Sequence, residues 1–167
     1  DRIEGSGFDG QAVGNEHLAP RLDGRLLLVK HEDPVTHAVF WVPPGGGIEG
    51  EESLLECVKR ETWEETGLSV EPERIVYVKE FVEPEADRHH CELFFLCGVI
   101  SGTLTTANLG PPDEDWIKEV RFLSREEMEG ITVYPEALKG EFWDDLAGGF
   151  VCARYLGVDR AGGDPPG

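Results

Sequence analysis

A helix whose two ends are both marked in the sequence constrains the fold of this chain more than any other feature. Ser53 followed three residues later by Glu56 has the pattern of a capping box, in which each side chain accepts a hydrogen bond from the other residue's backbone N–H. Gly67 stands where a helix commonly ends in a left-handed residue. The sequence therefore predicts a helix over residues 54–66, preceded by a flexible loop at Gly45–Gly47.

Short β-type runs lie on both sides of this helix. Patterns of alternating or briefly continuous apolar residues predict strands at 25–30, 39–42, 74–82, 91–100 and 116–123. A short helix is predicted to start at Ser124, and a second to run from Pro135 to Leu146. The order of strands, helix, strands and helices favours a mixed α/β sandwich over a repeated strand–helix–strand array.

The two ends of the chain lack such patterns. Residues 1–20 hold several glycines and few apolar side chains, and residues 160–167 contain Pro165-Pro166, so both segments are predicted to be flexible and without a chemical role. The chain of 167 residues is a natural length for one domain. We expect that domain at residues 21–159.

Charge excludes several classes of partner. With 15 Lys and Arg against 34 Asp and Glu, the net charge is −19, which repels nucleic acid polymers and acidic membranes. No apolar run approaches the roughly 20 residues of a membrane span. The four cysteines form no C-x-x-C pair and no secretory signal is visible, so we expect reduced, buried thiols in a cytoplasmic protein.

Three glutamates lie near the face of the 54–66 helix that should be apolar. The stripe that faces the core is predicted to consist of Leu54, Leu55, Val58 and Thr62. Glu61 and Glu65 fall inside or at the edge of that stripe, and Glu64 lies beside Glu61. Crowded carboxylates at a core boundary repel one another unless a cation offsets their charge. A divalent metal would do so, and a plain surface helix with Lys59 and Arg60 as local partners is the alternative.

The ligands on offer favour magnesium over zinc. They are hard oxygen atoms, with no thiolate or imidazole at a suitable spacing. Protein-bound Mg²⁺ commonly completes its shell with water and substrate phosphates. The Gly45–Gly47 segment, just before the helix, allows close backbone approach to such a site. These residues therefore point to phosphate chemistry.

Residues 46–68, which read GGIEGEESLLECVKRETWEETGL, resemble the signature of the Nudix family of MutT-like hydrolases. The matching positions are Gly46, Glu52, Arg60, Glu61, Glu64, Glu65, Gly67 and Leu68. Thr62 departs from the pattern, because an aliphatic residue is usual there. We expect its methyl group to face the core, as a packing compromise without loss of chemistry.

The resemblance implies a Nudix-type α/β/α sandwich with a mixed β-sheet. It also implies an enzyme that uses Mg²⁺ or Mn²⁺ to hydrolyse a nucleoside diphosphate linked to another moiety. Glu64 and Glu65 would ligate the metal, and Glu61 would bind metal or help to activate water. The Gly46 carbonyl would complete the shell, and Glu52 and Arg60 would orient the site, with a structural salt bridge as the alternative for that pair.

The general base is the least determined of the implied roles. In this family it is either the residue corresponding to Glu61 or an acid on a later loop. Residues Asp113, Glu114 and Asp115 occupy such a loop, and we take Glu114 as the candidate base. A solvated loop acid is the alternative for all three.

Residues outside the signature suggest a substrate. A proline 16 positions beyond the signature is associated with ADP-ribose-hydrolysing members, and Pro84 stands 16 residues after Leu68. Arg88 is a candidate contact for a terminal phosphate. The candidates to stack on a base, with the core as the alternative location, are Trp41, Phe81, Phe94 and Trp116.

These residues leave several functions open. ADP-ribose or a related nucleoside diphosphate sugar is the first expected substrate. A pyrophosphohydrolase of (d)NTPs that cleanses the nucleotide pool is the second possibility, and a catalytically silent nucleotide-binding module is the third. Many relatives form dimers, so a homodimer is also expected.

Overall fold

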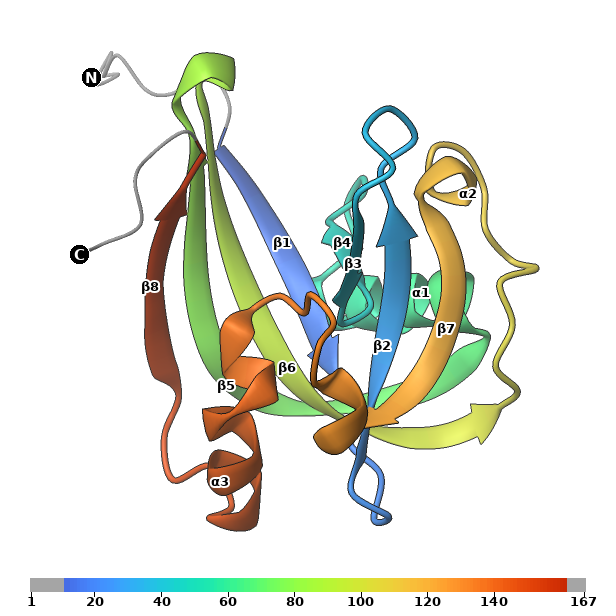
Figure 1. Ribbon diagram of the computed structural model, residues 1–167, viewed down its shortest axis with the longest axis vertical. Helices are drawn as coiled ribbons and strands as arrows, with labels where there is room; N and C mark the ends of the chain where they lie inside the picture. The colour runs from blue at the N-terminus through green and yellow to red at the C-terminus, as the bar shows by residue number, and fades with distance from the viewer. Residues whose placement is uncertain (1–10, 162–167) are drawn as a thin grey trace.

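The computed structural model describes residues 11–161, which form two β-sheets with helices on either side (Figure 1). The larger sheet has five strands in the order β4-β1-β6-β5-β8. Their bounds are Gln11–Leu18 for β1, Gly45–Gly47 for β4, Leu68–Glu83 for β5, Arg88–Gly102 for β6 and Arg154–Arg160 for β8. The sheet is mixed, because β1 pairs parallel with β6 and β5 parallel with β8, whereas β1–β4 and β5–β6 are antiparallel.

The smaller sheet is antiparallel and has the order β3-β2-β7. Its strands are β2 at Arg25–Glu32, β3 at Val39–Val42 and β7 at Ile117–Ser124. The helices are α1 at Leu54–Thr66, α2 at Asp113–Trp116 and α3 at Glu141–Ala147, with 3₁₀ turns at Pro84–Ala86 (η1), Glu126–Met128 (η2) and Glu136–Lys139 (η3). Within residues 11–161, no helix has the length and apolarity needed to cross a membrane.

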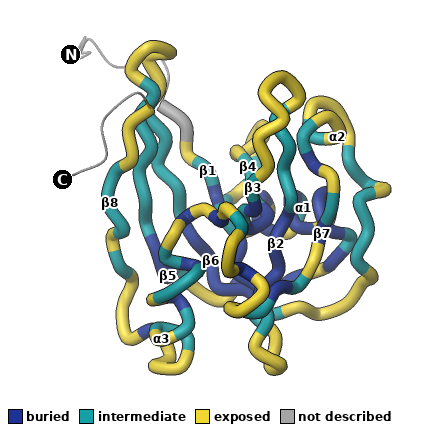
Figure 2. Tube along the Cα trace, in the orientation of Figure 1, coloured by how far each residue is buried: buried dark blue, intermediate teal, exposed yellow. Residues whose placement is uncertain are grey.

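Two apolar clusters hold these layers together. Val58 of α1 packs with Leu27 and Phe95 on one side of the sheets, and Phe142 of α3 packs with Leu28 and Phe94 on the other. In the view of Figure 1, α1 lies behind the strands and α3 in front of them. Figure 2 shows the buried segments concentrated where α1, β1, β2 and β6 meet. At the end that carries the β5–β6 hairpin, strands β5, β6 and β8 are partly buried or exposed. The predicted α/β sandwich with a mixed sheet is therefore confirmed.

Helix α1 has the predicted bounds, because its ends are set by local hydrogen bonds. The Ser53 side chain accepts from the Glu56 N–H and the Glu56 carboxylate accepts from the Ser53 N–H. Gly67 ends the helix at φ 75°, and its N–H donates to the Trp63 carbonyl. One prediction about its faces is wrong, since Leu55 is 49% exposed. It lies in the first turn, next to the exposed Glu56, rather than against a sheet.

The predicted flexible arm is wrong for residues 11–20, since β1 occupies Gln11–Leu18. This strand lies between β4 and β6, and its last residues are fully buried. Gly45–Gly47 is likewise not a loop but β4, whose backbone pairs with residues 14–16. At the other end β8 continues to Arg160, the first residue of the predicted tail. Residues 1–10 and 162–167, also predicted to be flexible, lie outside the described residues.

Other elements differ in extent. Strands β5 and β6 are longer than predicted because they pair with each other along most of their length, through several bulges. The single helix predicted from Pro135 to Leu146 is instead η3 and α3, which are separated at Gly140, where φ is −134° and ψ is −96°. The segment between the two predicted strands at 74–82 and 91–100 contains η1, at the tip of the β5–β6 hairpin.

Candidate active site

A cluster of three carboxylates lies where α1 meets α2. Glu61, Glu65 and Asp113 each place one oxygen atom within 4.8 Å of the others. Glu61 is 6% exposed and Glu65 is 4% exposed, whereas Asp113 is partly exposed. We call these three residues the carboxylate cluster. Its oxygen donors fit a hard divalent cation such as Mg²⁺ or Mn²⁺.

Strand β4 forms the wall beside this cluster, and its glycines are required there. A Cβ atom on Gly46 would collide with the carboxylate of Glu61. The backbone N–H of Gly45 donates to Glu65 Oε2 at 3.2 Å. The backbone of β4 therefore lies directly against both buried glutamates.

The electrostatics of the cluster call for a positive charge. Burial is the largest factor that raises the pKa of Glu61 to about 7, and the neighbouring Glu64 and Asp113 raise it further, against the opposite effect of Arg60. Burial also raises the pKa of Glu65 well above its ordinary range, and the Glu61 charge adds to this effect. Such carboxylates become ionised readily only when a cation compensates them. The donor set and its charge imbalance thus both fit a divalent metal.

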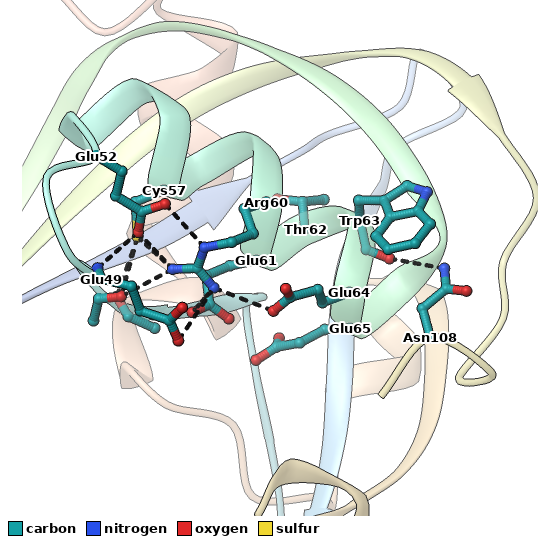
Figure 3. A network of polar contacts seen from close by, with 12 residues as sticks. Glu49, Glu52, Cys57, Arg60, Glu61, Thr62, Trp63, Glu64, Glu65 and Asn108 are labelled. Carbon is teal, nitrogen blue, oxygen red and sulfur yellow. Dashed lines mark hydrogen bonds and ion pairs between the residues drawn. The ribbon is translucent and has the colours of Figure 1, made fainter. Parts of the chain in front are cut away.

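Arg60 connects this cluster to a second set of carboxylates (Figure 3). Its guanidinium donates to Glu52 from Nε at 2.9 Å and from Nη2 at 2.6 Å. Its Nη1 donates to Glu61 at 2.7 Å and to Glu64 at 3.1 Å. We call Arg60 and its carboxylate partners Glu49, Glu52, Glu61 and Glu64 the arginine network. Its geometry matches the orienting role expected of Arg60 and Glu52.

The arginine network is electrostatically compensated. Hydrogen bonding to Arg60 is the main factor that lowers the pKa of Glu52 to about 2. The same partners raise the pKa of Arg60, so the guanidinium stays charged. Glu52 also accepts the N–H of Glu49 at 2.8 Å, which fixes the turn that leads into α1. Glu52 therefore holds Arg60 in place, and Arg60 holds Glu61.

Thr62, the departure from the family pattern, makes a specific buried contact. Its hydroxyl donates to the Val58 carbonyl and lies 2.8 Å from Nδ1 of His17 on β1. Both side chains are fully buried, and burial lowers the pKa of His17 to about 3, with the Arg60 charge adding to the effect. The neutral imidazole therefore donates from Nδ1 to the threonine oxygen. The expected packing compromise is in fact a polar link between α1 and β1.

Two residues with predicted roles in the chemistry, Glu114 and Glu64, lie at the edge of the carboxylate cluster. Glu114, the predicted base, is exposed, and the preceding residue, Asp113, is the one that joins Glu61 and Glu65. Both stand in a single turn of helix, α2, where successive side chains point in different directions. Glu64 projects beside Glu65 in Figure 3 and pairs with Arg60.

A pocket of about 530 Å³ opens between the two sheets. Its flat walls come from four aromatic side chains, Phe40, Phe81, Phe94 and Tyr134. Its ionisable lining consists of Glu16, Lys79, Glu92 and Asp159. Glu16 joins the pocket to the carboxylate cluster, because a Cβ atom on Gly45 would lie 2.7 Å from Glu16 Oε2. Gly45 also contacts Glu65 through its N–H.

Three of the predicted substrate contacts, Trp41, Pro84 and Arg88, do not line this pocket. Trp41 is 6% exposed and belongs to the core between the sheets, while its neighbours Phe40 and Val42 face the pocket. Alternation along β3 explains the difference, since successive side chains point to opposite faces. Pro84 and Arg88 are exposed at the tip of the β5–β6 hairpin. Of the aromatic candidates, Phe81 lines the pocket, whereas Phe94 borders it but is fully buried in the same core cluster as Trp41.

Sequence reasoning missed the contribution of β1 and the polar lining of the pocket. Glu16 lies in the segment predicted to be flexible, and its short run of polar residues carries little strand signal. Glu92 and Lys79 offered a weak signal, as charged residues within otherwise apolar strands. Their meeting across β5 and β6 depends on pairing between the strands.

Comparison with known proteins identifies relatives of this architecture. The family model described as the NUDIX domain matches residues 18–149. Phosphatase NudJ of Escherichia coli K12 is 33% identical over 63 residues, which are 38% of this chain and 40% of that protein. The aligned stretch thus spans less than half of this relative.

Solved structures share the fold at lower identity. A NUDIX hydrolase from Nitrosomonas europaea superposes with a TM-score of 0.66 at 22% identity, covering 87% of this chain and 92% of that one. An ADP-ribose pyrophosphatase from Streptococcus suis superposes with a TM-score of 0.61 at 21% identity, covering 89% and 98%. The family model covers most of the chain, and the fold agrees with it. This chain therefore belongs to the Nudix family.

Proposed function

We propose that this protein is a metal-dependent pyrophosphohydrolase that cleaves a nucleoside diphosphate linked to another moiety. The observation that carries the proposal is the carboxylate cluster, whose buried acids lie against the glycine backbone of β4. The cation would be Mg²⁺ or Mn²⁺. Glu61, Glu65 and Asp113 would hold it, with the Gly46 carbonyl as a further ligand and Glu64 beside them.

The residues of the site would have different roles in hydrolysis. A bound divalent cation would neutralise the diphosphate and lower the pKa of a water molecule. Glu61 or Asp113 would accept the proton from an attacking water, and Asp113 replaces Glu114 as our candidate loop base because it lies in the carboxylate cluster. Arg60 keeps Glu61 oriented through its 2.7 Å hydrogen bond. Glu52 in turn fixes Arg60, so both act as positioning residues.

For the substrate we propose ADP-ribose or a related nucleoside diphosphate sugar. The similar structure from Streptococcus suis is named an ADP-ribose pyrophosphatase, and the pocket of about 530 Å³ is of a size that accepts a nucleoside. Pro84 does not support this choice, since it lies at the hairpin tip outside the pocket. The support for this substrate is thus the pocket and the fold, and the (d)NTPs are the competing outcome.

A substrate screen tests the proposal. Purified protein with Mg²⁺ is incubated with ADP-ribose, UDP-glucose, (d)NTPs and dinucleoside polyphosphates, and phosphate is measured after coupling to a phosphatase or pyrophosphatase. We expect the highest kcat/KM for a nucleoside diphosphate sugar, and EDTA should abolish it. Preference for (d)NTPs would overturn the substrate assignment, and absence of turnover would indicate a binding module.

We also propose a cellular compartment and an oligomeric state for this protein. All four cysteines are free, and we propose a reducing compartment such as the cytoplasm; Cys57 and Cys97 are buried as expected, whereas Cys91 is partly exposed and Cys152 is exposed. A homodimer is our proposed assembly, and sedimentation velocity would test it.

A further inference from the structure

The pocket beside the carboxylate cluster has an excess of acidic groups. Of the four ionisable residues that line it, only Lys79 is a cation, and its Nζ lies 2.8 Å from Asp159 Oδ2 across β5 and β8. The positive charge of Lys79 is therefore already paired with an acidic residue of the protein. Lys79 also lies opposite Glu92 in the β5–β6 register, so this one cation is shared by Asp159 and Glu92. The charged neighbours of Glu16 are the acids Glu92, Glu65 and Glu61.

The carboxylates of Glu16 and Glu92 project from neighbouring strands into the same space. Glu16 lies opposite Phe94 in the β1–β6 register, and Glu92 lies opposite Gly14, two residues away on each strand. Residues two apart on a strand share a face, so both side chains point toward the pocket. The Oε2 atom of Glu16 is buried and has no hydrogen-bond partner. No hydrogen bond or ion pair joins the Glu92 carboxylate to another residue within the range 11–161.

The chemistry of these groups limits what the pocket can hold. Carboxyl oxygens that lack a partner in a half-buried wall can be satisfied by hydrogen-bond donors from a ligand. An anionic group would be repelled, because Lys79 is already paired. Phe40, Phe81 and Tyr134 give the pocket apolar aromatic surfaces against which a flat ring can pack.

We propose that Glu92, with Glu16 beside it, selects substrates whose group distal to the scissile diphosphate is a flat heteroaromatic ring that bears an amino group. The carboxylates accept its N–H bonds while the aromatic side chains contact its faces. This inference rests on the proposed function, because the pocket serves a substrate whose diphosphate lies at the carboxylate cluster. The shared wall at Gly45 provides that connection.

The test uses substrates that differ by one amino group. Kinetics are measured for ADP-ribose and for its analogue with unsubstituted purine in place of adenine, and for GDP-mannose and IDP-mannose, which differ at the 2-amino group. For at least one pair we expect the wild type to lose about tenfold in kcat/KM without the amino group, mainly through KM. In Glu92→Leu the paired substrates should differ by less than about threefold.

Two further variants separate recognition from folding. Glu92→Gln keeps a carbonyl acceptor and should retain part of the discrimination, whereas Glu73→Leu, an exposed acid on β5 outside the pocket, should retain all of it. Thermal melting verifies that each variant is folded. If Glu92→Leu does not fold, Glu92→Gln and Glu16→Gln still test the proposal, because each should reduce the discrimination.

Binding measurements distinguish this inference from the proposed function. Calorimetry with the non-hydrolysable methylene-bridged analogues of the same pairs reports discrimination even if the enzyme turns over none of them. Absence of turnover with retained discrimination would overturn the proposed function alone. Equal binding of both members of both pairs by the wild type, or unchanged discrimination in the Glu92 variants, would overturn the inference.

Discussion

The carboxylate cluster and the arginine network lie next to each other on α1 and differ in how their charge is balanced. In the arginine network every acid has Arg60 as a partner, and the pKa of Glu52 is lowered to about 2. In the carboxylate cluster neither Glu65 nor Asp113 has an arginine or lysine partner among residues 11–161, and burial raises the pKa of Glu65. The negative charge of the arginine network is thus neutralised by a residue of the protein, whereas the negative charge of the carboxylate cluster is neutralised only when a cation binds.

The largest expected effect follows from removing a charge in the carboxylate cluster. Glu65→Gln should lower kcat by about 1,000-fold, because it removes metal ligation without creating a cavity. The melting temperature in EDTA should not fall, since a buried, uncompensated acid has been replaced. Glu73→Gln on the exposed face of β5 is the control. Near wild-type kcat in Glu65→Gln would remove this residue from the metal site.

The next effect separates Asp113 from Glu114. Asp113→Asn should lower kcat by about 100-fold, because Asp113 lies in the carboxylate cluster, whereas Glu114→Gln should change it by less than about threefold. The measurement is kcat over a range of Mg²⁺ concentrations and pH. A large loss in Glu114→Gln alone would restore the base that the sequence suggested.

A smaller effect is expected from the arginine network. Glu52→Gln should lower kcat by about tenfold, since Arg60 loses its bidentate partner and Glu61 its orientation. Because the pKa of Glu52 in the folded protein is below its ordinary value of 4.5, the folded state binds fewer protons. Its stabilising contribution is complete above about pH 4.5 and is lost as the pH falls toward 2.

Urea denaturation at pH 2 to 5 checks this contribution. The free energy of unfolding should rise with pH across this window less steeply in Glu52→Gln than in the wild type. Equal slopes would show that the pairing with Arg60 adds nothing to stability.

Glu61 should give the opposite pH dependence in metal-free protein. Its pKa of about 7 exceeds the ordinary value of 4.5, so the folded state binds more protons between these pH values. Stability in EDTA should therefore decline as the pH rises from 4.5 through 7, and Glu61→Gln should flatten the decline. Melting temperatures measured across this range test the prediction, and a rise with pH in the wild type that Glu61→Gln abolishes would contradict it.

The smallest effect concerns the link between α1 and β1. Thr62→Val removes the hydroxyl that Nδ1 of His17 contacts and leaves a buried donor unpaired, which should reduce stability by about 1–2 kcal/mol. The kcat should be nearly unchanged. Chemical denaturation provides the measurement, and a more stable Thr62→Val would show that the family's usual aliphatic residue is preferred here as well.

The sequence predicted well those features that depend on neighbours along the chain. The bounds of α1 follow from Ser53, Glu56 and Gly67, whose hydrogen bonds all lie within one turn of the helix ends. The placement of Glu61 and Glu65 at the core boundary follows from helical periodicity, and both are buried. Glu61 and Glu65 could thus be proposed as candidate metal ligands without a structure.

Features that depend on distant pairing could not be predicted in this way. Strand β1 is held by β6, which lies more than 70 residues away, and its polar residues have weak strand propensity. Whether Asp113 or Glu114 faces the cluster depends on the single turn of α2. The predicted stacking residue Trp41 lies in the core, whereas its neighbour Phe40 lines the pocket, because alternation along β3 decides which side chain faces it.

Binding of Mn²⁺, followed by electron paramagnetic resonance, is the most direct test of the claim that a bound cation neutralises the charge of the carboxylate cluster. The protein is titrated as wild type, Glu65→Gln and Glu73→Gln without nucleotide and with the methylene-bridged ADP-ribose analogue. The account predicts saturable binding in the wild type and in Glu73→Gln, weakened at least about tenfold in Glu65→Gln. Equal affinity in all three proteins, or no saturable binding with the analogue present, would contradict it.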